Sequence, residues 1–266
     1  MIEKLHTRLR PLERVAVAYS GGVDSTLVLK AALDALGSEH VVALLAVSPS
    51  LPQSEKDEAI ALAKHLGARL ELLPTEETND PAYQANAPNR CYFCKDHVYR
   101  ALRQFAERNG IAHVLDGMNA EDTLDVRPGR AAARELKILS PLHDLGFSKK
   151  DVREVAKALG LPNWNKPAAA CLASRVPYGT SVTPKLLSQI ERAEAALFDL
   201  GYRELRVRHH GDVARLEVPE ADLLRALQQR EAITAALRAV GYTYITLDLA
   251  GLRTGSMNEV LKARST

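Results

Sequence analysis

The sequence predicts an α/β protein, a parallel sheet with helices on both faces, followed by a smaller C-terminal α+β domain. Within residues 1–170, short apolar segments alternate with longer segments of helical periodicity, the order typical of a parallel sheet with crossover helices. The first strand, 15–19, is almost uniformly apolar, as expected when both sheet faces are covered. Within residues 171–266, two alternating segments flank a tight turn, which indicates an antiparallel hairpin.

The elements of the first domain follow that alternation. Further strands are predicted at 40–47, 69–73 and 112–115, and helices at 26–36, 54–66, 94–108 and 148–159. Ser54 is expected to cap the second of these helices, the last begins at Ser148, and glycines follow the helix ends. Ligands of such sheets bind beyond the carboxyl ends of the strands, where the segment after residue 19 lies.

The second domain begins after a long segment, 163–183, that bears prolines and has no clear periodicity, which is typical of a functional loop or linker. Thr183 is predicted to cap a helix that Pro184 opens. The hairpin strands are predicted at 203–210 and 213–218. A helix reaching about residue 239 and a last strand, 242–249, complete the domain.

Composition describes an ordinary soluble globular protein, with 46% of the 266 residues apolar and 26% charged. A formal net charge of +2 gives no reason to expect a nucleic-acid partner or a membrane surface. No apolar run is long enough to span a membrane, and the first residues do not form a secretory signal. We therefore expect a cytoplasmic protein whose three cysteines form no structural disulfide.

The most informative segment is Ser20-Gly21-Gly22-Val23-Asp24-Ser25, between the first strand and the first helix of the sheet. Free backbone N–H groups and the positive end of a helix dipole converge there, which predicts a phosphate cradle. The pattern lacks the lysine of G-x-x-x-x-G-K-[ST] and does not match G-x-G-x-x-G. An ordinary turn with capping serines is the alternative, but all six residues directly after an apolar strand favour a nucleotide site.

Ser-Gly-Gly-x-Asp-Ser resembles the pyrophosphate loop of the ATP pyrophosphatase superfamily, whose members adenylate a substrate oxygen and release pyrophosphate. The resemblance implies that ATP is bound by Ser20, Gly21, Gly22, Asp24 and Ser25. Such chemistry normally requires Mg²⁺ on the phosphates. Asp24 is the nearest candidate to order the metal or the triphosphate, although an acid in a helix's first turn also favours the dipole.

The three cysteines are Cys91 and Cys94, in a C-x-x-C pattern, and the distant Cys171. This pattern has several interpretations. The C-x-x-C cysteines could be a redox pair or half of a zinc site, for which His97 is the obvious fourth ligand. All three cysteines could also be buried thiols without chemistry. Three thiolates also suit a 4Fe-4S cluster with one iron open to an exogenous ligand. Cluster or catalytic sulfur chemistry is favoured over zinc and over inert thiols.

Five further motifs occur along the chain: Asn89-Arg-Cys91-Tyr-Phe-Cys94-Lys95, Asp116-Gly-Met-Asn-Ala-Glu121-Asp122, Cys171-Leu-Ala-Ser174-Arg175-x-Pro177-Tyr178-Gly179, Arg206-Val-Arg208 and Gly251-Leu-Arg253-x-Gly255-Ser256-Met257-Asn258. Over nearly its full length the chain resembles the LarE family of ATP-dependent sulfurtransferases in nickel-pincer nucleotide biosynthesis. The resemblance implies an adenine nucleotide α-hydrolase-like fold. It also implies that ATP adenylates a carboxylate of pyridinium-3,5-biscarboxylic acid mononucleotide and that sulfur then displaces AMP to give a thiocarboxylate.

The family uses two sulfur strategies. In one, a single cysteine matching Cys171 gives up its sulfur; in the other, three cysteines hold a 4Fe-4S cluster with an exchangeable extra sulfide. This sequence resembles the second form, with Cys91, Cys94 and Cys171 as ligands, a sulfide donor as partner and a homo-oligomer as the expected assembly.

The resemblance further places the substrate phosphate at Arg206 and Arg208. The other residues matching family site positions are Ser174, Arg175, Glu194, Glu217 and Arg253. Arg253-Thr-Gly255-Ser256 would form a second anion-binding turn, and Glu121 and Glu217 are candidate Mg²⁺ ligands. Without the resemblance, the arginines read as a solvated strand face, the acids as surface ion pairs and the segment around Glu121 as a polar turn.

Three rival functions remain open. A tRNA thiolase should show a basic face, which the small net charge disfavours. A ligase like the NAD and GMP synthetases should carry or recruit an amidase when it uses glutamine. A non-catalytic nucleotide sensor would bind nucleotide without turnover.

Overall fold

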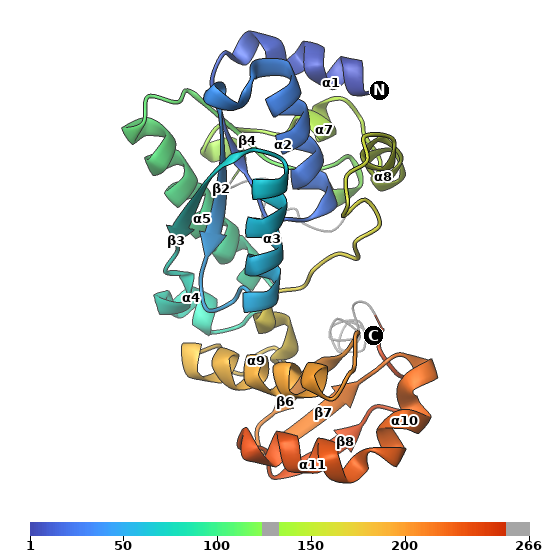
Figure 1. The fold of residues 1–266 in the computed structure, drawn as a ribbon. Coiled ribbons are helices and arrows are strands. Elements are labelled where there is room, and N and C mark those ends of the chain that lie inside the picture. The colour runs from blue at the N-terminus through green and yellow to red at the C-terminus, as the bar shows by residue number, and fades with distance from the viewer. Residues whose placement is uncertain (124–132, 254–266) are drawn as a thin grey trace. The chain divides into compact units, whose positions relative to one another are not determined.

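The computed structural model describes residues 1–123 and 133–253. The chain divides into two compact units, one made of Met1–Tyr83 and Asn89–Ala169, the other of Gln84–Pro88 and Ala170–Thr266 (Figure 1). Each unit has its own core and is described by itself. No described helix is both long enough and apolar enough to cross a membrane.

The first unit contains a five-stranded, wholly parallel sheet of order β3-β2-β1-β4-β5. Its strands are β1 (Val15–Ala18), β2 (Val41–Val47), β3 (Arg69–Pro74), β4 (His113–Leu115) and β5 (Ile138–Leu139). The predicted parallel α/β sheet is therefore confirmed. β5 was not predicted, because two residues are too few to show a period.

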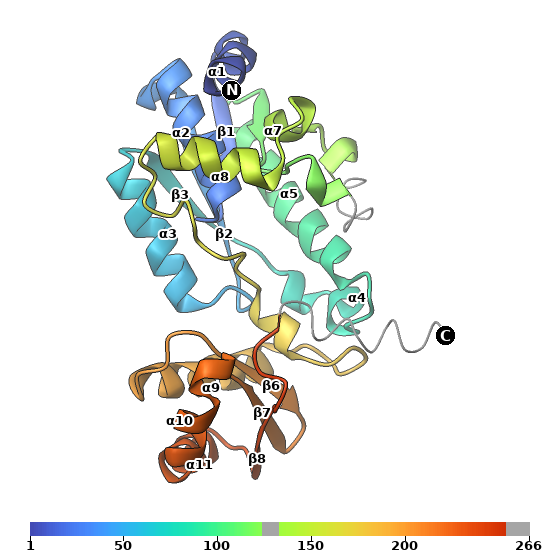
Figure 2. The same cartoon turned by 90° about the vertical axis from the view of Figure 1, so that its right-hand side faces the viewer.

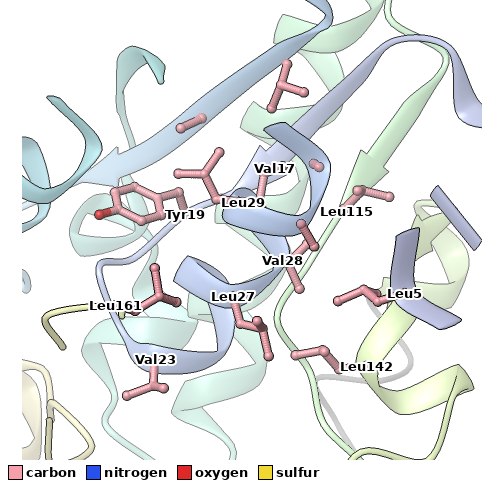
Figure 3. Close-up of a cluster of buried hydrophobic side chains, with 14 of the residues drawn as sticks. Leu5, Val17, Tyr19, Val23, Leu27, Val28, Leu29, Leu115, Leu142 and Leu161 are labelled. Atoms are coloured by element: carbon pink, nitrogen blue, oxygen red, sulfur yellow. The ribbon is translucent and has the colours of Figure 1, made fainter. Parts of the chain in front are cut away.

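Helices cover both faces of this sheet (Figures 1 and 2). Val15 and Val17 of β1 point into a core shared with α1 (Ile2–Leu9), α2 (Val23–Leu36), α3 (Gln53–His65), α7 (Pro141–Asp144) and α8 (Lys149–Ala158). Part of that core is drawn in Figure 3. Ala16, between the two valines, points to the opposite face and packs with α5 (Arg90–Arg108). This alternation is why the strands are apolar at almost every position.

Helix starts show what the sequence pattern did and did not determine. The helix predicted to begin at Ser148 is α8, where Ser148 forms a capping box with Asp151. Thr183 caps α9 (Pro184–Asp199), as predicted. The prediction for Ser54 was wrong, because α3 begins at Gln53 and Pro52 occupies the cap position. The helix predicted from residue 94 begins one turn earlier, at Arg90, so α5 contains both cysteines of the C-x-x-C pattern.

The second unit packs helices against a three-stranded sheet of order β6-β7-β8. α9 (Pro184–Asp199) is followed by the antiparallel pair β6 (Arg206–His210) and β7 (Val213–Glu217), which confirms the hairpin. The single helix expected before residue 239 is two, α10 (Leu223–Gln228) and α11 (Arg230–Ala239), and β8 (Tyr244–Leu247) lies parallel to β7. Apolar side chains of α9, α11 and this sheet form the unit's core.

Candidate active site

The Ser20–Ser25 loop leaves β1 at its carboxyl end and leads into α2. Its two serines face each other, with 3.1 Å between the Oγ atoms, and Ser25 also donates to the carbonyl of Gly22 at 3.1 Å. Gly22 occupies the cap position of α2, and Ser20 is exposed. The loop therefore presents hydroxyls and helix N-terminal amides together, the donor set that binds phosphate groups.

Two glycines let neighbouring segments approach this loop closely. A Cβ on Gly21, which has φ 73°, would lie 2.8 Å from the Cβ of Ala59 on α3. A Cβ on Gly117, which follows β4, would lie 2.6 Å from the backbone nitrogen of Ser25. Glycine is required at both positions, since any side chain would push α3 or the start of α2 away from the loop.

A polar network joins the start of α2 to the segment after β4. Asn119 donates from Nδ2 to Asp24 Oδ1 at 2.8 Å, and its own Oδ1 accepts the backbone N–H of Glu121 and of Asp122. Burial raises the pKa of Asp24; the hydrogen bond from Asn119 acts against that rise and the nearby Asp122 adds to it. Asp24 is thus held by Asn119, at the N-terminal end of the helix that follows the cradle.

Lys149 adds a cation to this network, which sequence reasoning did not single out. Its Nζ lies 3.3 Å from Asp122 Oδ1, and its backbone N–H donates to Glu121 Oε1 at 3.0 Å. Burial lowers the pKa of Lys149, but Asp122, with help from Glu121, outweighs it and the net pKa is raised. Lys149 is the first residue of α8 after the cap Ser148, and nothing in the local sequence indicates that it pairs with Asp122.

Cys91 and Cys94 lie near the start of α5, three residues apart, and so on the same side of the helix. Cys91 is exposed and Cys94 is half-buried. Cys171, half-buried in the second unit, precedes the short 3-10 helix Leu172–Arg175, and none of these three cysteines is in a disulfide. His97, the fourth zinc ligand considered above, has its Nε2 3.0 Å from Asp80 Oδ2.

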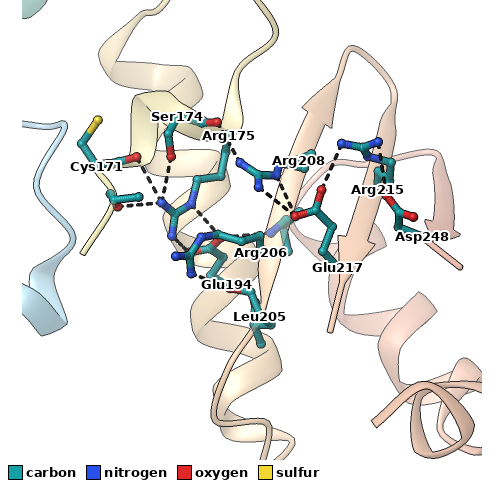
Figure 4. A network of polar contacts seen from close by, with 12 residues as sticks. Cys171, Ser174, Arg175, Glu194, Leu205, Arg206, Arg208, Arg215, Glu217 and Asp248 are labelled. Carbon is teal, nitrogen blue, oxygen red and sulfur yellow. Dashed lines mark hydrogen bonds and ion pairs between the residues drawn. The ribbon is translucent and has the colours of Figure 1, made fainter. Parts of the chain in front are cut away.

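Two buried ion pairs organise the second unit around Ser174 (Figure 4). Arg175 is bound by Glu194 through two hydrogen bonds of 3.0 Å, and its Nη1 donates to the carbonyls of Ala170 and Cys171. Arg208 donates to one oxygen of Glu217 at 3.0 and 2.8 Å and to the carbonyl of Ser174 at 2.9 Å. Glu194 of α9, Arg208 of β6 and Glu217 of β7, which the sequence singled out, thus belong to one network of charged hydrogen bonds.

Glu217 was a candidate Mg²⁺ ligand, and its surroundings favour another role. It is fully buried, with one oxygen bound by Arg208 and the other 3.0 Å from Arg215. Within the described residues of its own unit, 84–88 and 170–253, no group of three or more His, Cys, Asp or Glu side chains is arranged to hold a metal ion. The position of Glu217 is that of a carboxylate that orients two arginines.

Arg206 differs from its neighbours. It is half-buried and donates to the carbonyl of Leu205 at 3.0 Å, and no carboxylate among the described residues forms an ion pair with it. Burial lowers its pKa and the positive charges of Arg175 and Arg208 lower it further, whereas the charges of Glu194 and Glu217 act against this fall. A guanidinium without a carboxylate partner could bind an anion. Arg253 is exposed, whereas Gly255 and Ser256 of its expected turn lie outside the described residues.

The sequence is similar to a family model and to several known proteins. The NAD synthase family model matches residues 3–108. The chain is 44% identical, over 95% of its length and 92% of the relative's, to the pyridinium-3,5-bisthiocarboxylic acid mononucleotide synthase of Lactiplantibacillus plantarum. It is also 44% identical to an uncharacterized Synechocystis protein (98% and 97% covered) and 29% identical to one from Methanocaldococcus jannaschii (89% and 90% covered).

Proposed function

Because this chain belongs to the LarE family of ATP-dependent sulfurtransferases, with a pyrophosphate-loop ATP site, we propose that it makes a thiocarboxylate from a carboxylate of pyridinium-3,5-biscarboxylic acid mononucleotide. The observation that carries this proposal is the similarity to the synthase over nearly the whole of both chains. The loop at the carboxyl end of β1 supports it independently, since it has the donor set that a triphosphate needs.

The reaction divides into two displacements. A carboxylate oxygen of the substrate attacks the α-phosphorus of ATP, the bond to the bridging oxygen breaks, and pyrophosphate leaves. A sulfide then attacks the carbonyl carbon, the bond to the AMP oxygen breaks, and the product keeps sulfur in place of oxygen. In the first step the N–H groups and hydroxyls of Ser20–Ser25 would stabilise the charge that grows on the departing phosphates. Asp24 would hold the metal or the triphosphate in place.

The second unit supplies groups suited to the acidic nucleotide. We assign its phosphate to Arg206, whose guanidinium has no carboxylate partner in the part of the chain that the structure describes. Arg208 is held by Glu217, and Arg175 by Glu194. Ser174 and Arg253 complete the proposed set of substrate-binding residues. The backbone carbonyl of Cys171 accepts a hydrogen bond from Arg175, so Cys171 borders this set.

The sulfur source is proposed to be a 4Fe-4S cluster held by Cys91, Cys94 and Cys171. Cys91 and Cys94 fit two ligand positions, because they lie one turn apart on the same side of α5 and are not fully buried. The cluster, when bound, would supply the sulfide. The cysteines would hold it, and Arg175 would fix the backbone carbonyl of Cys171.

The function is tested with the purified protein, ATP, Mg²⁺, the biscarboxylic acid mononucleotide and sulfide. We expect AMP and pyrophosphate in equal amounts and, by mass spectrometry, a product in which sulfur replaces oxygen. ATP binding without release of AMP and pyrophosphate would overturn the proposal in favour of a nucleotide sensor.

The cluster is tested separately by anaerobic purification, assays of iron and acid-labile sulfide, and absorption at ~400 nm. Cys91→Ala, Cys94→Ala and Cys171→Ala should each abolish the chromophore, whereas Tyr92→Phe, between two ligands, should keep it. If Cys171→Ala alone stopped sulfur transfer and the other two variants were silent, the single-cysteine strategy would be supported instead.

A further inference from the structure

Asn163 lies far from the Ser20–Ser25 loop in sequence and contacts it directly. It follows α8, and its Nδ2 donates to the carbonyl of Gly21 at 3.0 Å and to Thr26 Oγ1 at 3.0 Å. Gly21 belongs to the loop and Thr26 to the first turn of α2. One amide group therefore ties the phosphate cradle to the helix that follows it.

The bond to Gly21 determines which way the next amide points. In a planar trans peptide the C=O and the following N–H point in opposite directions. With the Gly21 carbonyl bound by Asn163, the N–H of Gly22 points to the other side, where Ser20 Oγ lies 3.4 Å away. Two consecutive glycines make this peptide unusually free to rotate. A flip would turn a carbonyl oxygen toward the phosphates in place of an N–H.

The segment that carries Asn163 is itself anchored. Lys166 Nζ lies 2.7 Å from both Glu55 and Glu58 on α3, the helix whose Ala59 packs against Gly21. Trp164 lies beneath Lys157 of α8, with 4.7 Å from Nζ to the ring centroid. Residues 163–166 are thus held by α3 and by α8, so Asn163 approaches the loop from a fixed position.

We infer that Asn163 is a positioning residue of the ATP site, which keeps the Gly21–Gly22 peptide turned so that its N–H, and not its carbonyl, faces the bound phosphates. This role depends on the ATP chemistry proposed above. An aspartate at position 163 would have the same shape but could not donate to the Gly21 carbonyl, and its negative charge would repel that oxygen. A backbone N–H held in place beforehand, as proposed for Gly22, contributes both to ATP binding and to stabilising the negative charge that develops on the phosphates.

The test compares Asn163→Asp, which keeps the shape and removes the donor, with Asn163→Ala. The matched control is Asn165→Ala, an exposed asparagine in the same segment. Binding of Mg²⁺–ATP is measured by calorimetry, and by fluorescence of Trp164, the single tryptophan of the chain, in the wild type and Asn165→Ala. Substrate-dependent pyrophosphate–ATP exchange gives kcat and KM, and thermal unfolding without ligand reports on the fold.

We expect the Asp variant to bind ATP about 5- to 20-fold more weakly, the loss of one or two hydrogen bonds, with a lower kcat. Its unfolding midpoint should fall modestly, because the same bonds are part-buried in the unliganded protein. Asn165→Ala should match the wild type. If the wild type and Asn163→Asp bind ATP equally and exchange at equal rates, the role of Asn163 is refuted while the proposed function stands. If the wild type binds no ATP, the proposed function fails and this role fails with it.

Discussion

Arg175 and Glu194 form a buried ion pair with two hydrogen bonds of 3.0 Å, one from Nε and one from Nη2. Their side chains are 4% and 7% exposed, so both charges are almost wholly removed from water. The remaining nitrogen of Arg175 reaches the carbonyls of Ala170 and Cys171, while Glu194 also accepts the backbone N–H of Val207 on β6. The pair therefore connects α9, β6 and the segment that carries Cys171.

Removing one partner of this pair should destabilise the second unit strongly. Glu194→Ala would leave the Arg175 guanidinium buried without its counter-charge, which costs about 3–5 kcal/mol in the free energy of unfolding. Urea unfolding measures the effect, with Asp199→Ala, an exposed carboxylate on the same helix, as control. The control should stay within about 0.5 kcal/mol of wild type. A loss below about 1 kcal/mol for Glu194→Ala would show that the pair is not buried as described.

Arg206→Met should weaken substrate binding without a loss of stability. Burial and the charges of Arg175 and Arg208 disfavour the Arg206 cation more than Glu194 and Glu217 favour it, and no described carboxylate forms an ion pair with it. The KM for the acidic mononucleotide should rise about 10- to 100-fold, since hydrogen bonds to charged groups contribute about 1.5–3 kcal/mol. Steady-state kinetics and thermal unfolding measure the two effects.

The control for Arg206 is Arg203→Met, an exposed arginine just before the same strand. It should change neither KM nor the unfolding midpoint. A drop of several degrees in the midpoint of Arg206→Met, with KM unchanged, would make Arg206 a structural residue and remove it from the substrate site.

The sequence was sufficient for the first unit's architecture because its signals are local. An apolar strand, a glycine turn and a periodic helix are each read within about 15 residues, and their repetition indicates a parallel sheet. Residues 20–25 were found for the same reason. Helix α1 and strand β5 escaped prediction. The charged residues of α1 obscured its apolar positions, Leu5 and Leu9, and β5 has only two residues.

The partners within the site could not be predicted, because each pairing joins distant segments. Nothing local indicates that Glu194 binds Arg175 or that Asn163 binds Gly21, which lies 142 residues away. For Glu217 the resemblance identified the residue but not its environment, which consists of two arginines. A residue's type and period predict its face on an element, whereas its partner depends on how the elements pack.

Gly117→Ala should disturb the proposed ATP site by displacing the backbone at the start of α2. The new Cβ would lie 2.6 Å from the backbone nitrogen of Ser25, so the start of α2 must shift. Overpacking of this kind costs about 1–3 kcal/mol of stability, and ATP affinity should fall because the cradle donors move. Gly110→Ala is the control: a Cβ there meets nothing within 4 Å but strains a backbone of φ 64°, so this variant should lose some stability and keep its ATP affinity. Equal ATP affinity in the Gly117 variant and wild type, by calorimetry, would contradict the close approach.

Asp24→Asn should separate the proposed role of Asp24 in ATP chemistry from the cost in stability of burying its charge. Burial raises the pKa of Asp24 above the reference value of 3.8, so between these two values the folded state binds more protons than the unfolded state. The unfolding free energy contributed by Asp24 is then fully present below pH 3.8 and is lost as the pH rises through the folded pKa. The Asn variant lacks this loss and can still accept the hydrogen bond from Asn119.

The stability difference between Asp24→Asn and wild type should therefore be near zero at the lowest pH where both remain folded. It should grow in favour of the variant as the pH rises toward 7. Thermal unfolding across this pH range measures the difference in stability. The control is Asp34→Asn, a partly exposed carboxylate of α2 that pairs with Lys30. Because Asp24 would order the metal or the triphosphate, the same variant should lose pyrophosphate–ATP exchange although it is more stable at neutral pH. A variant that is less stable than wild type at pH 7, or that retains full exchange, would contradict a desolvated carboxylate acting on ATP.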